Sequence, residues 1–505
     1  MIKEKDIDLL IVNPEGRKRA YQSLSHTLTA IEPPIWAGLI ATFIRQKGFS
    51  VTILDANAEN LNIEDTSNVV ISINPLLTAI VVYGHNPSAS TQVMPAAGDI
   101  CTTLKIKAPE LKTILVGGHV SAIPERTIRD ENTTFVASGE GPYTILDLLK
   151  VLKANSSDDY SSVRSLYYKD KDSRYIIKSN PPAPLILDLD KEMPGIAWDL
   201  LPMDRYQAHN WHCFGGLSRK PYAAIYTTLG CPFHCNFCCI QAPFRDGEKA
   251  LGYNNKISSY RLWNPQSVIK QIDILVNEYD VHNIKFADEI FLLNTKHVEE
   301  ICDLIISRGY DLNIWAYARI DTSNKSILHK MKLAGINWLG LGIESASSRV
   351  RDNINKNYSH EHLLKAIEKL RTENIYIGGN YIFGLPEDDM ESMQTTLDLA
   401  LKINSEWANF YYAMAYPGSH LYNIALEKGW KLPESWSGYS QYSTDALPLP
   451  TKYLSAKEVL SFRDQAFQVY FSSPNYLDMI RQKFGEDTIR QIKEMMSHKI
   501  ERKFI

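Results

Sequence analysis

The chain has 505 residues, more than one hydrophobic core usually organises, so we expect two or three domains. Its composition is 44% hydrophobic and 22% charged with a net charge of −4, which excludes a basic surface for nucleic acid. No apolar run reaches the roughly 20 residues that span a bilayer, and the charged first residues lack the apolar stretch of a signal peptide. These features predict a cytoplasmic protein without a membrane span.

Short apolar strands alternate with helical stretches over the first part of the chain. Continuous apolar strands between helices are typical of a parallel sheet that is covered on both faces. We therefore predict a doubly wound, Rossmann-like α/β domain over residues 1–154, with ligands beyond the carboxyl ends of its strands. The predicted strands are 9–12, 51–54, 79–83, 114–116 and 135–137, and the predicted helices are 35–47, one near 95–104 and one ending at 149.

Residues 155–215 differ in composition from the segments on either side. They contain a serine and aspartate run, a charged stretch around 169–173 and Pro181-Pro182. We predict a linker that includes a small hairpin.

A second alternation begins at Tyr222 and contains six strand–helix units, which predict a partial (β/α)6 barrel of the TIM type over residues 216–429. Residues 430–505 are aromatic and then helical, with Ser455-x-x-Glu458 as a capping box. The predicted barrel strands are 222–227, 284–287, 314–318, 338–343, 379–383 and 410–414.

Four of the seven cysteines lie within nine residues just past the first barrel strand, where barrels place their chemistry. Cys231, Cys235 and Cys238 have a spacing that suits three irons of a cubane cluster, with the fourth iron left without a protein ligand. Cys239 follows Cys238 directly and would point elsewhere, so we interpret it as a packed thiol.

A structural zinc site is the main alternative for these cysteines, with His234 and Cys239 nearby as further ligands. Structural zinc sites usually draw on two separated ligand pairs, and the sequence has no second pair. The pattern therefore favours an iron–sulfur cluster, and we interpret His234 as structural or facing solvent.

The segment Gly-Cys-Pro-Phe-His-Cys-Asn-Phe-Cys at 230–238 resembles the cluster motif of the radical S-adenosylmethionine (SAM) superfamily. The segments 286–289, 340–345, 379–386 and 416–419 look like later strand ends of that family. The resemblance implies a 4Fe-4S cluster and SAM as cofactors. It also implies SAM contacts by Phe237, Asp288, Glu289, Arg319, Gly342, Glu344, Ser345 and Asn380, although Asp288 and Glu344 could instead be strand-end carboxylates in surface ion pairs.

The first domain resembles the cobalamin-binding domain that precedes the barrel in one class of radical SAM enzymes. Three turns occur in family order, at 83–91, 116–120 and 139–141, and the resemblance covers about residues 5–475. It implies cobalamin as a third cofactor. The implied contacts are His85, Asn86, Ser88, Ser90, Thr91, Gly117, Gly118, His119, Val120, Gly139, Glu140 and Gly141.

The loop after the first strand departs from many other cobalamin domains, because residues 13–17 contain no histidine. The cobalt would then lack a lower ligand from that motif, and the turn at His85-Asn86 could lie beneath the corrin. A flavin or nucleotide site and a domain that binds nothing are the alternatives. No Gly-x-Gly-x-x-Gly follows the first strand, which disfavours a dinucleotide.

The family resemblance implies a mechanism as well as cofactors. The reduced cluster would cleave SAM to a 5′-deoxyadenosyl radical, the radical would remove a hydrogen from an unactivated carbon, methylcobalamin would supply the methyl group, and a second SAM would restore it. We therefore expect methylation of a small biosynthetic molecule, with an electron donor such as flavodoxin or ferredoxin and no nucleic acid partner.

Three alternatives stay open at this point: oxidative rearrangement or cyclisation without methyl transfer, a vestigial first domain, and a metal-binding protein without turnover. The tail aromatics Trp436, Tyr439, Tyr442 and Tyr453 either line a substrate pocket or pack the tail onto the barrel.

Overall fold

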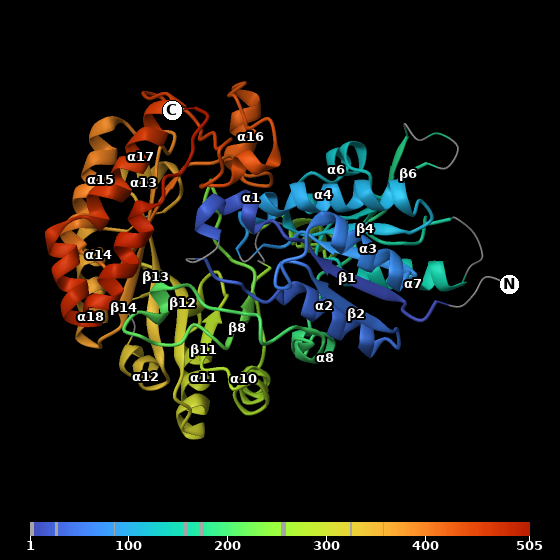
Figure 1. Ribbon diagram of the computed structural model, residues 1–505, viewed down its shortest axis with the longest axis horizontal. Coiled ribbons are helices and arrows are strands. Elements are labelled where there is room, and N and C mark those ends of the chain that lie inside the picture. The colour runs from blue at the N-terminus through green and yellow to red at the C-terminus, as the bar shows by residue number, and fades with distance from the viewer. Residues whose placement is uncertain are drawn as a thin grey trace.

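The computed structural model describes residues 5–25, 29–84, 86–154, 159–170, 173, 176–253, 259–323, 326–356 and 358–504. Two separate sheets organise the chain, one in the N-terminal part and one in the following barrel (Figure 1). The α/β fold class predicted from the sequence is confirmed.

The first sheet has seven strands in the order β2-β1-β3-β4-β5-β6-β7. The first five strands pair in parallel, whereas β6 and β7 add antiparallel at one edge. The hairpin expected in the linker is thus the β6–β7 pair. The strands are β1 (Leu9–Asn13), β2 (Val51–Asp55), β3 (Leu77–Val81), β4 (Thr113–Val116), β5 (Phe135–Ala137), β6 (Leu166–Lys169) and β7 (Ile177–Ser179).

Helices cover both faces of this sheet because alternate residues of its strands point to opposite sides. Leu9 and Ile11 of β1 pack in the same core as helices α2 (Ile35–Gln46) and α7 (Pro142–Ala154). Leu10 and Val12 pack with helix α4 on the other side. The helices on that side and at the strand ends are α1 (Arg17–Tyr21), α3 (Ile63–Ile73), α4 (Ala89–Lys107), α5 (Gly118–Ala122) and α6 (Pro124–Asp130).

The second sheet is a partial barrel of six parallel strands in the order β15-β14-β13-β12-β11-β8. Its strands are β8 (Tyr222–Ile225), β11 (Asn283–Phe286), β12 (Asn313–Arg319), β13 (Ile336–Glu344), β14 (Tyr376–Phe383) and β15 (Trp407–Tyr412). The outer helices are α10 (Pro265–Tyr279), α11 (Thr295–Arg308), α12 (Leu328–Leu333), α14 (His360–Thr372) and α15 (Met390–Ile403).

A short segment closes the amino-terminal end of the barrel. Trp211 packs edge-on against Trp315 at 5.1 Å and Trp338 at 5.3 Å between ring centroids. The His212 Nε2 atom lies 3.0 Å from the carbonyl oxygen of Asn313. Side chains of this segment therefore fill the amino-terminal end of the barrel.

The C-terminal region contacts both parts of the molecule. Helices α17 (Ala456–Phe471) and α18 (Pro474–Ser497) cover the barrel on the side away from the first domain (Figure 1). The segment between the barrel and α17 reaches the first domain, where Trp436 meets the His119 ring at 4.5 Å and the Arg126 guanidinium at 4.6 Å. The capping box at Ser455 and Glu458 is confirmed.

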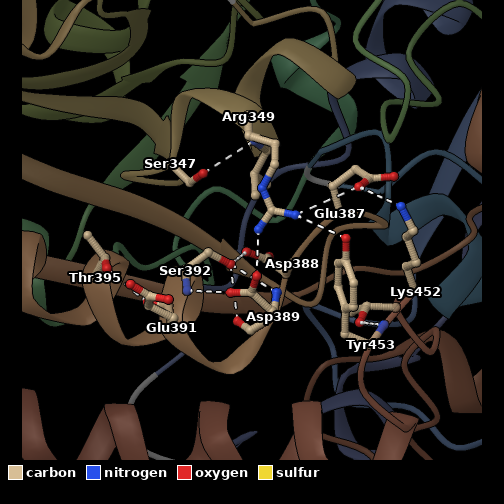
Figure 2. Close-up of polar contacts among 12 residues, drawn as sticks. Ser347, Arg349, Glu387, Asp388, Asp389, Glu391, Ser392, Thr395, Lys452 and Tyr453 are labelled. Atoms are coloured by element: carbon tan, nitrogen blue, oxygen red, sulfur yellow. Dashed lines mark hydrogen bonds and ion pairs between the residues drawn. The ribbon is translucent and has the colours of Figure 1, made fainter.

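A polar network holds the rim of the barrel after β13 and β14 (Figure 2). Arg349, in helix α13 (Ser348–Asn353), forms a 2.6 Å ion pair with Asp389, which caps α15. The Arg349 guanidinium also lies 3.5 Å from the Tyr453 hydroxyl. These contacts fix the segment that follows β13, where the sequence predicts SAM contacts.

Among the described residues, no helix combines the length and the apolar character that crossing a membrane requires.

Candidate cofactor sites

The cysteine loop leaves the barrel sheet through a sharp turn at Gly230. This residue has φ +81°, and a Cβ there would lie 2.5 Å from the Ser259 carbonyl oxygen, so only glycine fits. The loop is then held at both ends. Gln241 donates a hydrogen bond to the carbonyl of Cys231, and the Leu421 amide donates to the carbonyl of Asn236 at 2.8 Å.

The three predicted ligands line one cavity of about 1300 Å³ at the carboxyl ends of the barrel strands, which we call the cluster cavity. Most residues predicted to contact SAM lie in its wall, which brings segments more than 140 residues apart in the sequence to one site. The wall contains Cys231, Cys235, Cys238, Phe237, Glu289, Arg319, Gly342, Glu344 and Asn380. Cys239, expected to point elsewhere, is buried but also lines this cavity.

Two of the predicted SAM residues lie beneath the cavity rather than in its wall. The Asp288 carboxylate is fully buried and accepts hydrogen bonds from the Thr227 amide at 2.6 Å and the Thr228 amide at 2.9 Å. Burial raises the pKa of Asp288 to about 6. Ser345 is also fully buried, with its hydroxyl 3.3 Å from that of Thr396. Both side chains support the loops that carry the cavity.

Glu344 points into the cluster cavity because the backbone is irregular there. The register between β13 and β14 shifts between Gly342 and Glu344, and Glu344 has φ +63°, which is uncommon for a residue with a side chain. Bulges of this kind re-aim side chains next to active sites. The Glu344 carboxylate accepts a hydrogen bond from Lys356, and both side chains are more than nine-tenths buried.

Lys356 lines the cluster cavity and was not predicted from the sequence. It lies beyond β13, after helix α13, in a segment without a recognisable motif. Its ammonium group and the Glu344 carboxylate together present one positive and one negative group to the cavity, which matches the carboxylate and the amine of an amino acid.

Arg319 ends β12 beside the cysteine loop. Its guanidinium lies 3.8 Å from the centre of the Phe233 ring and donates a hydrogen bond of 3.5 Å to Cys235 Sγ. A 2.9 Å ion pair with Asp321 fixes this orientation. A positive group on a ligand sulfur stabilises the reduced form of an iron–sulfur cluster, because hydrogen bonds to the sulfurs influence its potential.

Glu289 lies at the boundary between the two parts of the molecule. Its side chain faces the cluster cavity and also a smaller cavity lined by Trp36 and Tyr83 of the first domain. Its position deep in the molecule raises its pKa to about 8, although the nearby charge of Lys285 opposes this shift. Glu289 is therefore protonated or only partly ionised near neutral pH.

The donor set fits a cluster. Burial raises the pKa of Cys231 to about 12, so the free thiol is not a nucleophile at neutral pH and becomes a thiolate only beside a metal. Among the described residues, no three His, Cys, Asp or Glu side chains converge on one metal ion. A cubane cluster does not require such convergence, because each thiolate binds a different iron.

The first sheet has its own cavity, of about 950 Å³, which we call the switch-point cavity. Strand β1 lies between β2 and β3, so the order of the strands reverses between β1 and β3. Doubly wound sheets bind their ligands at this point. The cavity is lined by Asn13, Arg17, Pro33, Trp36, Tyr83 and Gly84, among others. Trp36 and Tyr83 stack at 4.3 Å between ring centroids and form an apolar floor.

The residues predicted to contact cobalamin fall into two groups, while His85 lies outside the described residues. Asn86, Ser88, Ser90 and Gly118 line cavities between the first domain and the barrel. The others line none of these cavities and build the turns beneath them: Thr91, Gly117, His119, Val120, Gly139, Glu140 and Gly141. Among these glycines, Gly117 allows the closest packing of two backbone segments, because a Cβ there would lie 2.1 Å from the Val82 carbonyl oxygen.

His119 is buried in the neutral form. Its Nδ1 atom lies 3.1 Å from the Thr91 hydroxyl, and Ser90 accepts a hydrogen bond of 2.8 Å from its backbone amide. Burial lowers the pKa of His119 to about 3, with a smaller contribution from the charge of Arg126. The imidazole therefore belongs to the packing of the turn.

This burial predicts sensitivity to acid. Below a pH near 6.5 the unfolded chain binds a proton at His119 that the folded protein does not, so stability falls as the pH decreases toward 3. We expect His119→Phe to reduce this slope by up to about 1.4 kcal/mol per pH unit. Urea unfolding of both proteins between pH 6.5 and 5 would measure it, and equal slopes would contradict the prediction.

A third cavity, of about 740 Å³, lies inside the barrel, and we call it the lumen cavity. It shares Tyr21, Glu32, Gln92 and His209 with the wall of the switch-point cavity. It shares Asn86, Ser88, Tyr317, Tyr411, Tyr416 and Gln441 with the wall of the cluster cavity. The lumen cavity thus adjoins both of the other cavities, between the two sheets.

Comparison with known proteins identifies both parts of the chain. The B12 binding domain family matches residues 22–149, and the radical SAM superfamily matches residues 225–400. Together these segments cover more than half of the chain. They contain β3 and β4 of the first sheet and the cysteine loop of the barrel.

Curated relatives match over most of their length. An uncharacterized methyltransferase of Pyrococcus horikoshii is 27% identical over 88% of this chain and 89% of its own. An anaerobic magnesium-protoporphyrin IX monomethyl ester cyclase of Rubrivivax gelatinosus is 26% identical over 78% of this chain and 67% of its own. A cytidylyl-2-hydroxyethylphosphonate methyltransferase of Streptomyces wedmorensis is 24% identical over 84% of this chain and 83% of its own.

The fold is also that of a solved structure. The radical SAM methyltransferase TsrM of Kitasatospora setae, solved with cobalamin and a [4Fe-4S] cluster, superimposes with a TM-score of 0.64 over 92% of this chain and 89% of its own, at 15% identity. A B12-binding domain followed by a radical SAM barrel defines a class of enzymes that use both cofactors. The chain belongs to these cobalamin-dependent radical SAM enzymes, and its cofactors are a 4Fe-4S cluster, SAM and cobalamin.

Proposed function

We propose that the enzyme transfers a methyl group to an unactivated carbon of a small molecule. The observation that carries this proposal is that the lumen cavity shares wall residues with the other two cavities, because a substrate held there would lie next to both cofactor regions. The methyltransferases among the relatives support methyl transfer as the reaction.

We further propose a role for each region of the site. Cys231, Cys235 and Cys238 hold the cluster, Glu344 and Lys356 hold the amine and carboxylate of SAM, and the switch-point cavity holds cobalamin. When bound, the cluster and SAM supply a hydrogen-abstracting radical, and cobalamin supplies the methyl group. The protein orients these groups and excludes water.

The first domain covers the mouth of the barrel, and this arrangement supports the proposed roles of the regions. Residues of the turn after β3 line both the cluster cavity and the lumen cavity, so the first domain closes the carboxyl-terminal end of the barrel. Trp211 closes the other end. An enclosed barrel protects a reactive intermediate from water and other quenchers.

The mass of the product tests the reaction. With methyl-deuterated SAM, a reductant and a turned-over substrate, a methyltransferase adds three deuterons to the product. A product that keeps its carbon count would instead favour the second candidate, oxidative cyclisation, for which the Rubrivivax gelatinosus relative provides the specific support.

The proposed SAM contact at Glu344 has its own prediction. We expect Glu344→Ala to weaken SAM binding by at least about tenfold, because it removes a charged hydrogen-bond acceptor and leaves Lys356 without its partner. The iron content should not change, since Glu344 does not hold the cluster. Equilibrium binding of SAM to the cluster-loaded protein measures the effect.

Glu391→Ala is the matched control for this experiment. Glu391 is exposed in the first turn of α15 (Figure 2). It does not line the cluster cavity. Its replacement should leave SAM affinity unchanged. Unchanged affinity in Glu344→Ala as well would remove Glu344 from the SAM site.

The proposed reaction also requires partners. One-electron reduction of a cluster needs a donor, for which we propose a small protein such as flavodoxin or ferredoxin. We propose the cytoplasm as the compartment, because free thiols and a reduced cluster persist in a reducing environment. We propose a small-molecule substrate and no nucleic acid partner, since the net charge of −4 provides no basic field.

A further inference from the structure

The lumen cavity contains chemistry that none of the cofactor assignments uses. Its walls come from barrel strands β11, β12 and β15, from the first domain and from the tail after the barrel. The shared residues described above place it next to both the switch-point cavity and the cluster cavity. A molecule in this cavity would therefore lie where both cofactors can act on it.

Aromatic rings dominate the wall of the lumen cavity. The rings come from elements far apart in the sequence, and several contact one another: Trp315 meets Tyr317 edge-on at 4.9 Å, and Tyr21 stacks with Tyr442 at 5.6 Å. The aromatic rings of this wall make more favourable contacts, stacked or edge-on, with another aromatic ring than with a saturated group. The tryptophan and tyrosine residues of the wall are Tyr21, Trp211, Trp315, Tyr317, Tyr411, Tyr416 and Tyr442.

The charged groups of the cavity balance one another. Lys285 pairs in register with Trp315 across β11 and β12, so both side chains lie on the same face of the sheet. The Lys285 ammonium forms a 2.9 Å ion pair with Glu32 of the first domain and lies 5.0 Å from the centre of the Trp315 ring. Both charged side chains are more than nine-tenths buried.

The remaining polar groups of the wall are neutral or lie next to this pair. His209 Nε2 lies 3.8 Å from the Glu32 carboxylate. Asn409, Ser440 and Gln441 supply amides and a hydroxyl. A ligand with an unbalanced charge would compete with the buried pair and leave one of its members uncompensated, which is costly. A neutral ligand with hydrogen-bonding groups avoids this cost.

We propose that the lumen cavity is the substrate site and that it takes an aromatic small molecule with a polar but uncharged substituent. Its wall combines residues from both parts of the chain, and small-molecule sites occur preferentially at such interfaces between domains. The ring would stack among the seven tryptophan and tyrosine side chains, and the substituent would meet the Lys285–Glu32 pair. This assignment rests on the proposed function for the location of the two cofactors.

The test uses the protein loaded with cluster and cobalamin and a matched pair of probes, 3-phenylpropanamide and 3-cyclohexylpropanamide. The saturated ring is the more apolar of the two, so hydrophobic burial alone would favour it. We expect the phenyl probe to bind about tenfold more tightly, because several ring contacts each add to its affinity. Competition between the probes in saturation-transfer NMR measures this ratio.

Two variants test whether the aromatic side chains of the lumen cavity cause this preference for the phenyl probe. Tyr442 lines the lumen cavity but neither cofactor cavity. It is only half-buried, so the Tyr442→Leu variant should fold. This variant should bind the phenyl probe more weakly, with little change in its affinity for the cyclohexyl probe. Tyr310 is also half-buried and lies outside all described cavities, so Tyr310→Leu should leave the ratio of the two probe affinities unchanged. A charged probe, 3-phenylpropanoate, should bind more weakly than the amide.

Three results would overturn the proposal: equal affinities for the phenyl and cyclohexyl probes, no effect of Tyr442→Leu on the binding of the phenyl probe, or tighter binding of 3-phenylpropanoate than of the amide. Displacement of cobalamin by the phenyl probe would overturn it as well, because the cavity would then belong to the cofactor. The proposed function is judged separately, by formation of 5′-deoxyadenosine from SAM. Loss of that activity with intact probe selectivity would contradict the proposed reaction and leave the aromatic site standing.

Discussion

Replacing any one of Cys231, Cys235 and Cys238 by alanine is expected to abolish formation of 5′-deoxyadenosine and to remove most of the bound iron. The physical reason is that each thiolate binds one iron of the cluster, so a single loss leaves two irons without a protein ligand. The three cysteines line the same cavity, and neighbouring protein groups do not offer a substitute thiolate except Cys239. Iron analysis and product detection after anaerobic reduction measure the two effects.

Cys239→Ala is the matched control for the three ligand variants. Cys239 is buried and lines the same cavity, and burial raises its pKa to about 12, as it does for Cys231. We expect this variant to keep its iron and its activity. Iron loss in Cys239→Ala would show that this residue is a ligand, and 5′-deoxyadenosine formation by Cys235→Ala would contradict the assignment of the motif.

Glu140→Ala is expected to destabilise the protein by about 3–5 kcal/mol, because it leaves the buried guanidinium of Arg261 without its partner. The two side chains are 5% and 8% exposed and are joined by contacts of 2.6 Å and 3.2 Å. Glu140 also accepts a hydrogen bond of 2.9 Å from the Ile186 amide. The pair therefore joins the first domain, the linker and the strand that precedes helix α10.

The thermal unfolding midpoint measures this effect, together with retention of cobalamin after gel filtration. The exposed pair of Glu125 and Arg129 is the matched control, because an ion pair at 65% and 58% exposure contributes about 1 kcal/mol or less. The double variant Glu140→Leu/Arg261→Met should recover much of the lost stability. A Glu140→Ala midpoint equal to that of Glu125→Ala would show that the buried pair does not join the domains.

Local patterns in the sequence predicted the architecture and the cluster loop. Strand β5 coincides with the predicted residues 135–137, and the six barrel strands occur where apolar runs alternate with helical stretches. Boundaries were less exact where apolar runs are long. Strand β3 begins at Leu77 rather than at residue 79, since a continuous apolar run gives no internal signal for its ends. Helix α3 was missed because polar residues interrupt its apolar face.

The site residues also differ in how well the sequence alone predicts them. The three cysteines belong to one short loop, so their spacing alone predicts a cluster site, and the structure places all three in the wall of one cavity. The Glu32–Lys285 and Glu140–Arg261 pairs join segments that meet only through the fold, and they span 253 and 121 residues. Lys356 lies only 12 residues from its partner Glu344, but its segment has no recognisable motif. Residues identified by motif alone, such as Thr91 and His119, turned out to build the turns beneath the cavities. Single-sequence patterns carry information on spacing but not on such contacts between distant segments.

Anaerobic purification with added hydroxocobalamin, followed by iron, zinc and cobalt analysis of the chain, would show whether the protein holds both a cluster and a corrinoid. We expect about four iron and one cobalt per chain, with the absorbance of both groups. Iron without cobalt would contradict the role of the switch-point cavity, and zinc in place of iron would contradict the assignment of the three cysteines.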